Sequence, residues 1–245
     1  MFFLIFLVGL IIGSFLNVCI YRIPREESIV FPPSHCASCN HKLVWYDLFP
    51  VISYIILRGR CRYCNTKISI VYPIIELLNG VIYILLYIKF GLSILFIKYS
   101  ILASLVIVIS IIDLFTTDIY TNTIWFGTAI GIIFIIISIL MKQNIFTYII
   151  GAIIGAGVIT IIILTTKGMG WGDAELLFVI GLFLGIKLSI VTIFLSFILG
   201  GLIGSILIML KIKSRKDYIP FGPFISAGAL ISILWGDILL RYYTF

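Results

Sequence analysis

Two aspartates stand where long apolar runs of the chain meet polar segments. Asp113 comes directly after one apolar run, and Asp173 directly precedes another. A carboxylate is costly to keep charged beside hydrocarbon, so an aspartate retained at such a boundary is a functional candidate, for proton transfer in catalysis or for ion coupling. We therefore take these two residues as the first candidate site.

Glycines alternate with larger residues in the stretch before the second aspartate. Gly168, Gly170 and Gly172 lead into Asp173. Glycine adopts positive φ freely and has no Cβ, so another chain can lie against the backbone here. A Gly-x-Gly stretch by itself is more often a turn between helices than a site. Its interpretation as part of a site depends on the second carboxylate, Asp113.

A separate cluster of reactive residues lies in the polar segment 21–69. Two Cys-x-x-Cys knuckles, with 21 residues between them, are formed by Cys36, Cys39, Cys61 and Cys64. This spacing is typical of a closed tetrahedral zinc site with four thiolate ligands, which leaves no open position and makes the metal structural. Disulfides are the alternative, and a cytoplasmic face disfavours them.

Other potential ligands and the small size of the segment bear on the same site. His35 and His41 flank the first knuckle and are alternative ligands, although histidines in exposed loops more often have no such role. Cys19 lies in an apolar run, where we expect it to pack. A segment this short has little core of its own, so metal binding would supply folding free energy.

Composition sets the environment in which these residues act. Of the 245 residues, 62% are hydrophobic, and the mean hydropathy is +1.26, far above that of a water-soluble domain. Residues 1–20 lack a basic start and a clear cleavage site, so we expect a retained membrane span. The net charge of +7 comes from loops beside apolar runs and predicts topology, not nucleic-acid binding.

Spans of about 20 apolar residues are needed to cross a membrane. The apolar runs predict eight, of which the sixth is the shortest: 1–20, 70–88, 92–112, 122–140, 147–165, 174–187, 189–210 and 220–240.

Basic residues predict the orientation of these spans. If 21–69 is cytoplasmic, the cytoplasmic loops hold 12 of the 17 lysines and arginines: Arg22, Arg25, Lys42, Arg58, Arg60, Arg62, Lys67, Lys167, Lys211, Lys213, Arg215 and Lys216. The positive-inside rule then places both termini outside. Asp113 and Asp173 consequently both lie at the cytoplasmic face of the membrane.

Several motifs in order resemble one family, the type IV prepilin peptidases, which are leader peptidases and N-methyltransferases of the membrane aspartyl protease class. The similarity runs nearly end to end. It is carried by the run from Gly13-Ser14-Phe15-Leu16-Asn17 to Ile23-Pro24, the paired knuckles, Ser53-Tyr54, Arg58-Gly59-Arg60-Cys61-Arg62, Tyr72-Pro73-Ile74-Ile75-Glu76, the stretch 168–173 and Pro220-Phe221-Gly222-Pro223.

Two positions depart from the family pattern. The first aspartate of the family usually opens a run ending in Ile-Pro-Asn or Ile-Pro-Asp, whereas Asp113 leads here to Ile119-Tyr120 without a proline. Asp113 still fits better than Asp118, because it follows the apolar run directly and has a leucine beside it. After the second box the family commonly has a lysine two residues on, where this chain has Glu175, which reverses a local charge.

The resemblance implies an aspartyl endopeptidase that removes the short basic leader of type IV prepilins and pilin-like secretion proteins. Asp113 and Asp173 would be catalytic, since two carboxyls sharing a site hold a single proton between them. The glycines at 168, 170 and 172 would form the loop along which substrate approaches. The family's second activity methylates the new N-terminal amine with S-adenosylmethionine, for which Asn17, Arg22 and Glu76 are the candidates; for Glu76, capping or pairing at the start of its span is an equal alternative.

The predicted fold is an all-α polytopic membrane protein of about eight helices, with a zinc-ribbon-like cytoplasmic domain inserted after the first. We expect a first span over 1–20, a four-cysteine domain over 21–69 that also serves methyl transfer, and a peptidase domain over 70–245. The expected partners are prepilins and membrane lipids, without nucleic acid. A transporter or assembly scaffold with a zinc-ribbon loop is the alternative, but we find no inverted repeat. A presenilin-type protease would lack the knuckles.

Overall fold

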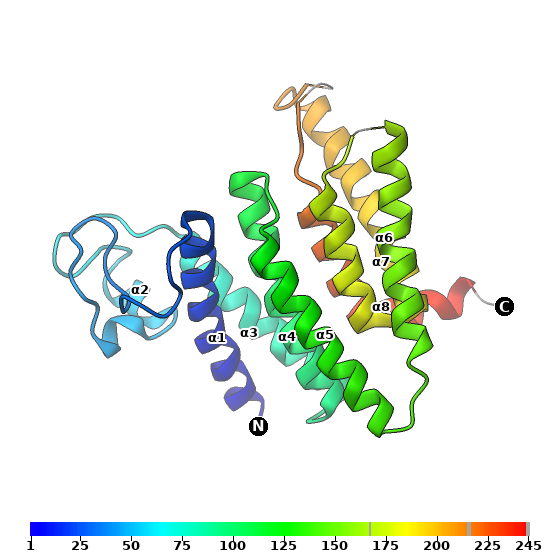
Figure 1. Ribbon diagram of the computed structural model, residues 1–245. Coiled ribbons are helices and arrows are strands. Elements are labelled where there is room, and N and C mark those ends of the chain that lie inside the picture. The colour runs from blue at the N-terminus through cyan, green and yellow to red at the C-terminus, as the bar shows by residue number, and fades with distance from the viewer. Residues whose placement is uncertain (167, 215–216, 244–245) are drawn as a thin grey trace. The chain divides into compact units, whose positions relative to one another are not determined.

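The structure, a computed structural model, describes residues 1–166, 168–214 and 217–243 of the chain (Figure 1). Lys167, Arg215 and Lys216, which entered the charge count, lie outside the described residues. Helices account for the regular structure of this part of the chain, and the only β-pairing found in it is two isolated bridges.

Seven of the described helices are long and apolar enough to cross a membrane, one fewer than the eight expected. They are α1 (Phe2–Arg22), α3 (Val71–Phe90), α4 (Ile94–Thr116), α5 (Thr121–Leu140), α6 (Phe146–Thr166), α7 (Trp171–Met209) and α8 (Gly222–Tyr243). The prediction of an all-α, multi-pass membrane protein is confirmed. The count is lower only because α7, which is counted once, contains both expected spans 174–187 and 189–210.

Helix α7 folds back on itself at Gly185. This residue has φ 73° and ψ 179°, a backbone conformation that residues with side chains rarely adopt. Its two limbs pack against different helices. The first lies antiparallel to α6, with Leu177 beside Gly155 and Gly181 beside Ala152, and the second lies antiparallel to α8. Figure 1 shows the two limbs running in opposite directions. The two predicted spans therefore correspond to two limbs of one helix.

Small residues allow α6 and α7 to approach closely. A Cβ added at Gly181 would lie 2.4 Å from the backbone of Ala152, and one added at Gly151 would lie 2.6 Å from the carbonyl carbon of Gly185. Contacts of this kind replace the hydrophobic driving force that helices lack inside a membrane. They fix the position at which α7 turns, and with it the position of the start of α7.

The chain divides into two compact units, Met1–Val108 and Ile109–Phe245, and the boundary in the sequence falls within α4. In the first unit α1 packs on α3 at Gly9 and Gly80. Asn79 of α3 donates a hydrogen bond to the Gly9 carbonyl at 2.7 Å and accepts one from Ser104 at 3.2 Å. These bonds satisfy polar groups that would be costly to leave unpaired in hydrocarbon.

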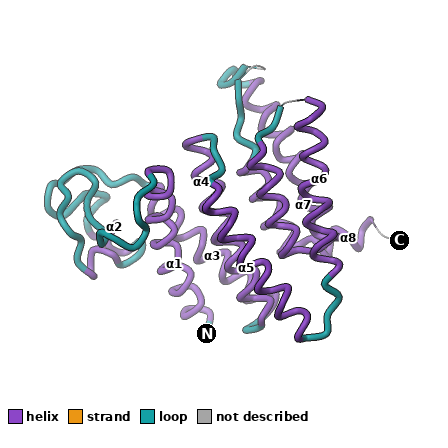
Figure 2. The backbone as a smooth tube through the Cα atoms, viewed as in Figure 1, coloured by secondary structure: helices purple, strands orange, loops and turns teal. Residues whose placement is uncertain are grey.

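The segment between α1 and α3 is mostly loop, as Figure 2 shows. It contains the short helices η1 (Ile23–Arg25), η2 (Trp45–Leu48) and α2 (Ile52–Ile56), and the bridges His35–Lys42 and Arg60–Lys67. Each bridge closes one of the two Cys-x-x-Cys knuckles. The segment therefore has little regular structure besides the knuckles to hold it together.

Candidate functional site

Asp113 lies in the last turn of α4, with only 2% of its surface exposed. Its Oδ2 accepts a hydrogen bond of 2.9 Å from the backbone amide of Gly222, the first residue of α8, although the two residues are 109 positions apart. A Cβ at Gly222 would come within 2.6 Å of the same oxygen. The carboxylate thus lies against the N-terminus of α8, where the free amides and the helix dipole favour a negative charge.

Asp173 lies in the first turn of α7 and is 3% exposed. Its Oδ2 accepts a hydrogen bond of 3.2 Å from the backbone amide of Gly170, the N-cap residue of that helix. This is one half of a capping box, in which an acidic residue at the third helical position reaches back to the cap. Each candidate aspartate is therefore held at a helix N-terminus by the amide of a glycine.

The two carboxylates converge at one end of the second unit. A Cβ added at Gly170 would lie 3.8 Å from Asp173 Oδ2 and 3.9 Å from the hydroxyl oxygen of Tyr218, which precedes Gly222 by four residues. Burial raises the pKa of Tyr218, and the charges of Asp173 and Asp113 raise it further. Tyr218 is therefore a neutral hydrogen-bond donor that lies within electrostatic range of both carboxylates.

The other residues that the sequence analysis named near the two aspartates differ in their exposure and contacts. Asp118 and Glu175 are exposed, in contrast to the two buried carboxylates. A Cβ at Gly172 would come within 2.7 Å of the Ile119 side chain, so this glycine accommodates the loop that follows α4. Gly168 and Gly170 have no contact as close. Gly168 and Gly170 are therefore the two glycines of this stretch whose backbone another chain could approach.

The four cysteines of the knuckles come together. Their Sγ atoms all lie within 4.8 Å of one another, and those of Cys36 and Cys64 are 3.8 Å apart. With metal–sulfur bonds of about 2.3 Å, a tetrahedral site places its sulfurs about 3.8 Å apart. The cluster thus has the dimensions of a four-thiolate metal site.

The two knuckles repeat the same backbone geometry. Asn40 follows the first Cys-x-x-Cys and donates its amide to Cys36 at 2.8 Å, and Asn65 does the same to Cys61 at 3.0 Å. Both asparagines have positive φ, 55° and 59°. Asparagine tolerates this conformation better than most residues. The sequence motif is therefore Cys-x-x-Cys-Asn, and the asparagine is a part of it that the spacing of the cysteines alone does not reveal.

Thiolate ligands are favoured at the second knuckle. Hydrogen bonds from the side chain and backbone of Thr66 lower the pKa of Cys64 to about 6. The thiolate is the form of cysteine that binds metal. Neither histidine belongs to the cluster: the His41 ring stacks on Tyr63 with centroids 3.7 Å apart, and His35 lies 3.1 Å from the carbonyl of Pro33.

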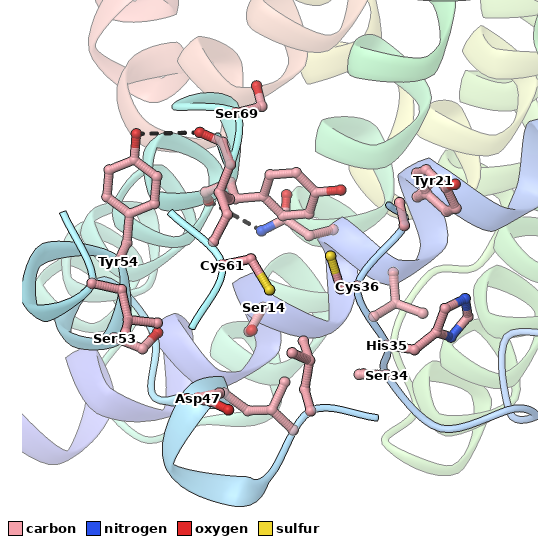
Figure 3. Close-up of a pocket in the computed structure, with 18 of the residues that line it drawn as sticks. Ser14, Tyr21, Ser34, His35, Cys36, Asp47, Ser53, Tyr54, Cys61 and Ser69 are labelled. Atoms are coloured by element: carbon pink, nitrogen blue, oxygen red, sulfur yellow. Dashed lines mark hydrogen bonds between the residues drawn. The ribbon is translucent and has the colours of Figure 1, made fainter. Parts of the chain in front are cut away.

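A cavity of about 400 Å³ lies between the knuckles and the spans of the first unit (Figure 3). Asn17, Arg22 and Glu76, the three candidates for methyl transfer, all line it. Cys36 and Cys61 line the cavity too, and Figure 3 shows their sulfur atoms near each other. The structure therefore brings the three candidates to one place, directly beside the metal-site cysteines.

Two of these three residues, Arg22 and Glu76, tie the loop to the spans, and Asn17 ties α1 to α3. Arg22 donates to the carbonyls of Ser28 at 2.8 Å and Pro32 at 2.7 Å. Asn17 donates to the carbonyl of Tyr72 at 3.1 Å.

Glu76, the carboxylate among the three candidates, binds the backbone of the loop. Glu76 accepts a hydrogen bond of 2.8 Å from the amide of Val51. The alternative role of Glu76, pairing within the protein, is thus observed. Glu76 also lines the cavity. Glu76 is therefore both a tie between the loop and α3 and a part of the cavity wall.

Comparison with known proteins agrees with this arrangement. Residues 7–90 match the model of the bacterial peptidase A24 N-terminal domain, and residues 100–205 match that of the type IV leader peptidase family. A prepilin leader peptidase/N-methyltransferase of Bacillus subtilis (strain 168) is 30% identical over 98% of this chain and 96% of its own length. The chain belongs to the type IV leader peptidase family.

Other relatives in this family carry the same printed name. The protein from Aeromonas hydrophila is 31% identical over 98% of this chain and 92% of its own length, and that from Pseudomonas putida is 29% identical over 94% and 88%. No solved structure matches the chain. The first family model covers the cysteines and the cavity, and the second covers both aspartates.

Two residues beside the candidate aspartates were not assigned a role from the sequence. Gly222 belongs to the motif Pro220-Phe221-Gly222-Pro223, which was noticed for its resemblance only, and it holds Asp113. Tyr218 lies just before that motif. A glycine between two bulky positions at the start of an apolar run was the available signal, because it indicates a close approach of another part of the chain.

Proposed function

We propose that this protein is a membrane-embedded aspartyl endopeptidase that removes the short basic leader from type IV prepilins and pilin-like proteins at the cytoplasmic face. Asp113 and Asp173 are its catalytic pair. The observation that carries the proposal is that two buried carboxylates converge at one end of the helices of the second unit, each bound by a glycine amide.

The carboxylate pair supplies the acid and the base of peptide hydrolysis. Two neighbouring carboxyls share one proton near working pH, because both do not ionise easily together. The ionised member takes a proton from water as the water oxygen bonds to the scissile carbonyl carbon, and the protonated member gives its proton to the carbonyl oxygen. When the C–N bond breaks, the departing amine takes the proton that the first carboxylate took from water, and a hydroxyl of the intermediate returns its proton to the second carboxylate as the new acid forms. The glycine amides occupy Oδ2 of each aspartate, which leaves the Oδ1 atoms for water and substrate.

The position of the pair suits a substrate with a basic leader and an apolar helix. Such a protein has its cleavage point at the membrane boundary, where the spans that carry Asp113 and Asp173 end or begin. The excess of basic residues in the loops on that side supports a cytoplasmic active site, with both termini outside. Gly168 and Gly170 offer the open backbone along which the extended leader junction could lie.

Methyl transfer to the new N-terminal amine is assigned to the first unit. The cavity there falls within the size range of small-molecule sites, about 300–1,000 Å³. S-adenosylmethionine would supply the methyl group, with Glu76 and Asn17 as polar contacts on the walls of the cavity and Arg22 holding the loop over it. The carboxylate of Glu76 can hold the substrate amine by charge, and one of its oxygens is already oriented by Val51.

Structural zinc is the metal that fits the four cysteines. Four thiolates and a closed tetrahedral geometry are typical of structural zinc, and such a metal stabilises a fold with little core of its own. It would hold the two knuckles together beside the cavity, without taking part in either reaction.

The decisive experiment is incubation of the purified protein with a prepilin, with and without S-adenosylmethionine, followed by intact-mass measurement of the product. We expect loss of the leader mass in both cases and a gain of one methyl group only when the cofactor is present. An unchanged prepilin would exclude the peptidase, and a cleaved but never methylated product would exclude the second activity alone.

A further inference from the structure

The segment 45–56, which includes η2 and α2, presents an apolar surface that nothing in the first unit covers. Seven of its twelve residues are large apolar side chains that are between 40% and 73% exposed: Trp45, Tyr46, Leu48, Phe49, Ile52, Ile55 and Ile56. Water-soluble surfaces rarely carry so dense a group of such residues unless they bind something. We call this group the interfacial face.

The interfacial face carries no exposed charge. The only charged residue of 45–56 is Asp47, whose side chain is 2% exposed and accepts a hydrogen bond of 2.8 Å from Arg62. Arg58, Arg60 and Arg62, which follow shortly after the segment, are exposed. An apolar, aromatic-rich surface with arginines at its edge is the pattern of protein segments that lie in the headgroup region of a membrane.

Contacts within the first unit place the segment beside the spanning helices. Val51 donates its amide to Glu76, which lies five residues into α3, about 8 Å from the start of that helix at 1.5 Å per residue. Leu48 and Ser53 line the same cavity as Ser14, which lies eight residues before the end of α1. The segment therefore lies beside the outer turns of both spans.

We propose that the interfacial face of residues 45–56 lies in the membrane itself, at the boundary between the lipid headgroups and the acyl chains. The distance of about 8 Å along α3 is comparable to the 5–10 Å by which interfacial segments are buried. Tryptophan and tyrosine are enriched at that level of a membrane. The tethering of 23–70 by spans at both its ends keeps the face at this depth. The proposal does not depend on either enzymatic activity.

A consequence is that the segment 21–69 has two environments. The knuckles, with their exposed asparagines and basic residues, face water, as expected from the sequence. The segment between them is part of the membrane surface and would anchor the metal site and the cavity at the level of the lipid headgroups.

Lipid quenching of Trp45 fluorescence tests the proposal. The metal-loaded full chain and its Trp45→Phe variant are placed in phosphatidylcholine–phosphatidylglycerol vesicles, and the difference of their emission spectra isolates Trp45. We expect most of this emission to be lost when the lipid is brominated near the ester end of the acyl chain, less when it is brominated near the methyl end, and little when iodide is added to the water.

A matched control places a tryptophan on the knuckle. Trp45→Phe combined with Tyr63→Trp keeps an aromatic ring stacked on His41, and its added emission should respond to iodide and not to brominated lipid. Trp45→Phe combined with Ile55→Trp repeats the test at a second position of the interfacial face and should behave as Trp45 does.

Two results would overturn the proposal. Quenching of Trp45 and of the tryptophan at position 55 by iodide alone would place the face in water. Protection of both from iodide and from brominated lipid would mean that protein covers the face, either a second copy of this chain or another partner.

Discussion

The two candidate sites are built on different physical foundations. At the proposed peptidase site, Asp113 and Asp173 accept hydrogen bonds from backbone amides at the starts of helices, so long packed helices set their positions. At the cavity of the first unit, Arg22 and Glu76 bind the backbone of a loop that has little regular structure. The geometry of the first site therefore depends on helix packing, and the geometry of the second depends on the interactions that fold the loop. The comparison predicts that the two activities can be disabled separately.

The largest expected effect comes from replacing either aspartate, which should lower cleavage without lowering methylation. Asp113→Asn or Asp173→Asn should lower leader cleavage by about 10²–10⁴-fold, because each removes one member of the acid–base pair. Methylation of a pre-cleaved pilin should continue, since its amine is already free. Cleavage is measured by intact mass and methylation by transfer of labelled methyl groups.

Asp118→Asn is the matched control for this prediction. Asp118 is exposed in the loop after α4, so its loss should leave cleavage near that of the wild type. Normal cleavage in Asp113→Asn together with lost cleavage in Asp118→Asn would show that the wrong aspartate had been chosen. Loss of methyl transfer in Asp173→Asn would show that the two sites are not separable.

Removal of the metal should have the opposite selectivity. Cys61→Ser, or prolonged chelation, should reduce bound zinc from about one per chain to near zero and abolish methylation. Binding of structural zinc contributes about 10–16 kcal/mol to the folding of such small domains. Cleavage should fall much less, because the carboxylate pair is held by helices of the second unit. Mass spectrometry measures the zinc bound per chain. A metal-free wild type that is folded and fully active would show that zinc is not required.

An intermediate effect on cleavage is expected from a substitution at Gly222, whose backbone amide binds Asp113. Gly222→Ala should lower cleavage by about 100-fold, because its Cβ would lie 2.6 Å from Asp113 Oδ2 and displace a catalytic group by a fraction of an ångström or more. Methylation and zinc content should not change. Gly157→Ala is the matched control, since a Cβ there meets nothing within 4 Å. Equal activity of the two variants would show that the bond from Gly222 to Asp113 has no catalytic importance.

The smallest expected effect concerns the tyrosine beside the pair. Tyr218→Phe should lower kcat/KM for cleavage about fivefold, the equivalent of one hydrogen bond of about 1 kcal/mol. The pKa of Tyr218 is raised, so the phenol remains protonated through neutral pH and can donate to substrate. A pH profile for the variant that keeps the wild-type shape at a lower level supports this role. No change in kcat/KM would limit Tyr218 to packing.

Much of the chemistry was determined by local sequence. The apolar runs predicted a multi-pass helical protein because hydropathy over about 20 residues requires no knowledge of the fold. The spacing of Cys36, Cys39, Cys61 and Cys64 predicted a metal site because each knuckle is a short-range structure. Asp113 and Asp173 were chosen as candidates because a charge beside hydrocarbon is conspicuous in any context.

The tertiary structure decided which distant groups meet. The bond from Gly222 to Asp113 joins residues 109 positions apart, and no local pattern specifies that pairing. The sequence predicted two separate spans in α7, and the structure shows how they are joined, by a reversal at Gly185 where α7 packs closely against α6. The use of Gly172 to accommodate Ile119, and the level at which residues 45–56 lie beside Glu76, were settled in the same way. Hydropathy and spacing describe what a segment prefers, whereas these contacts depend on the close approach of backbones, which only the packed helices determine.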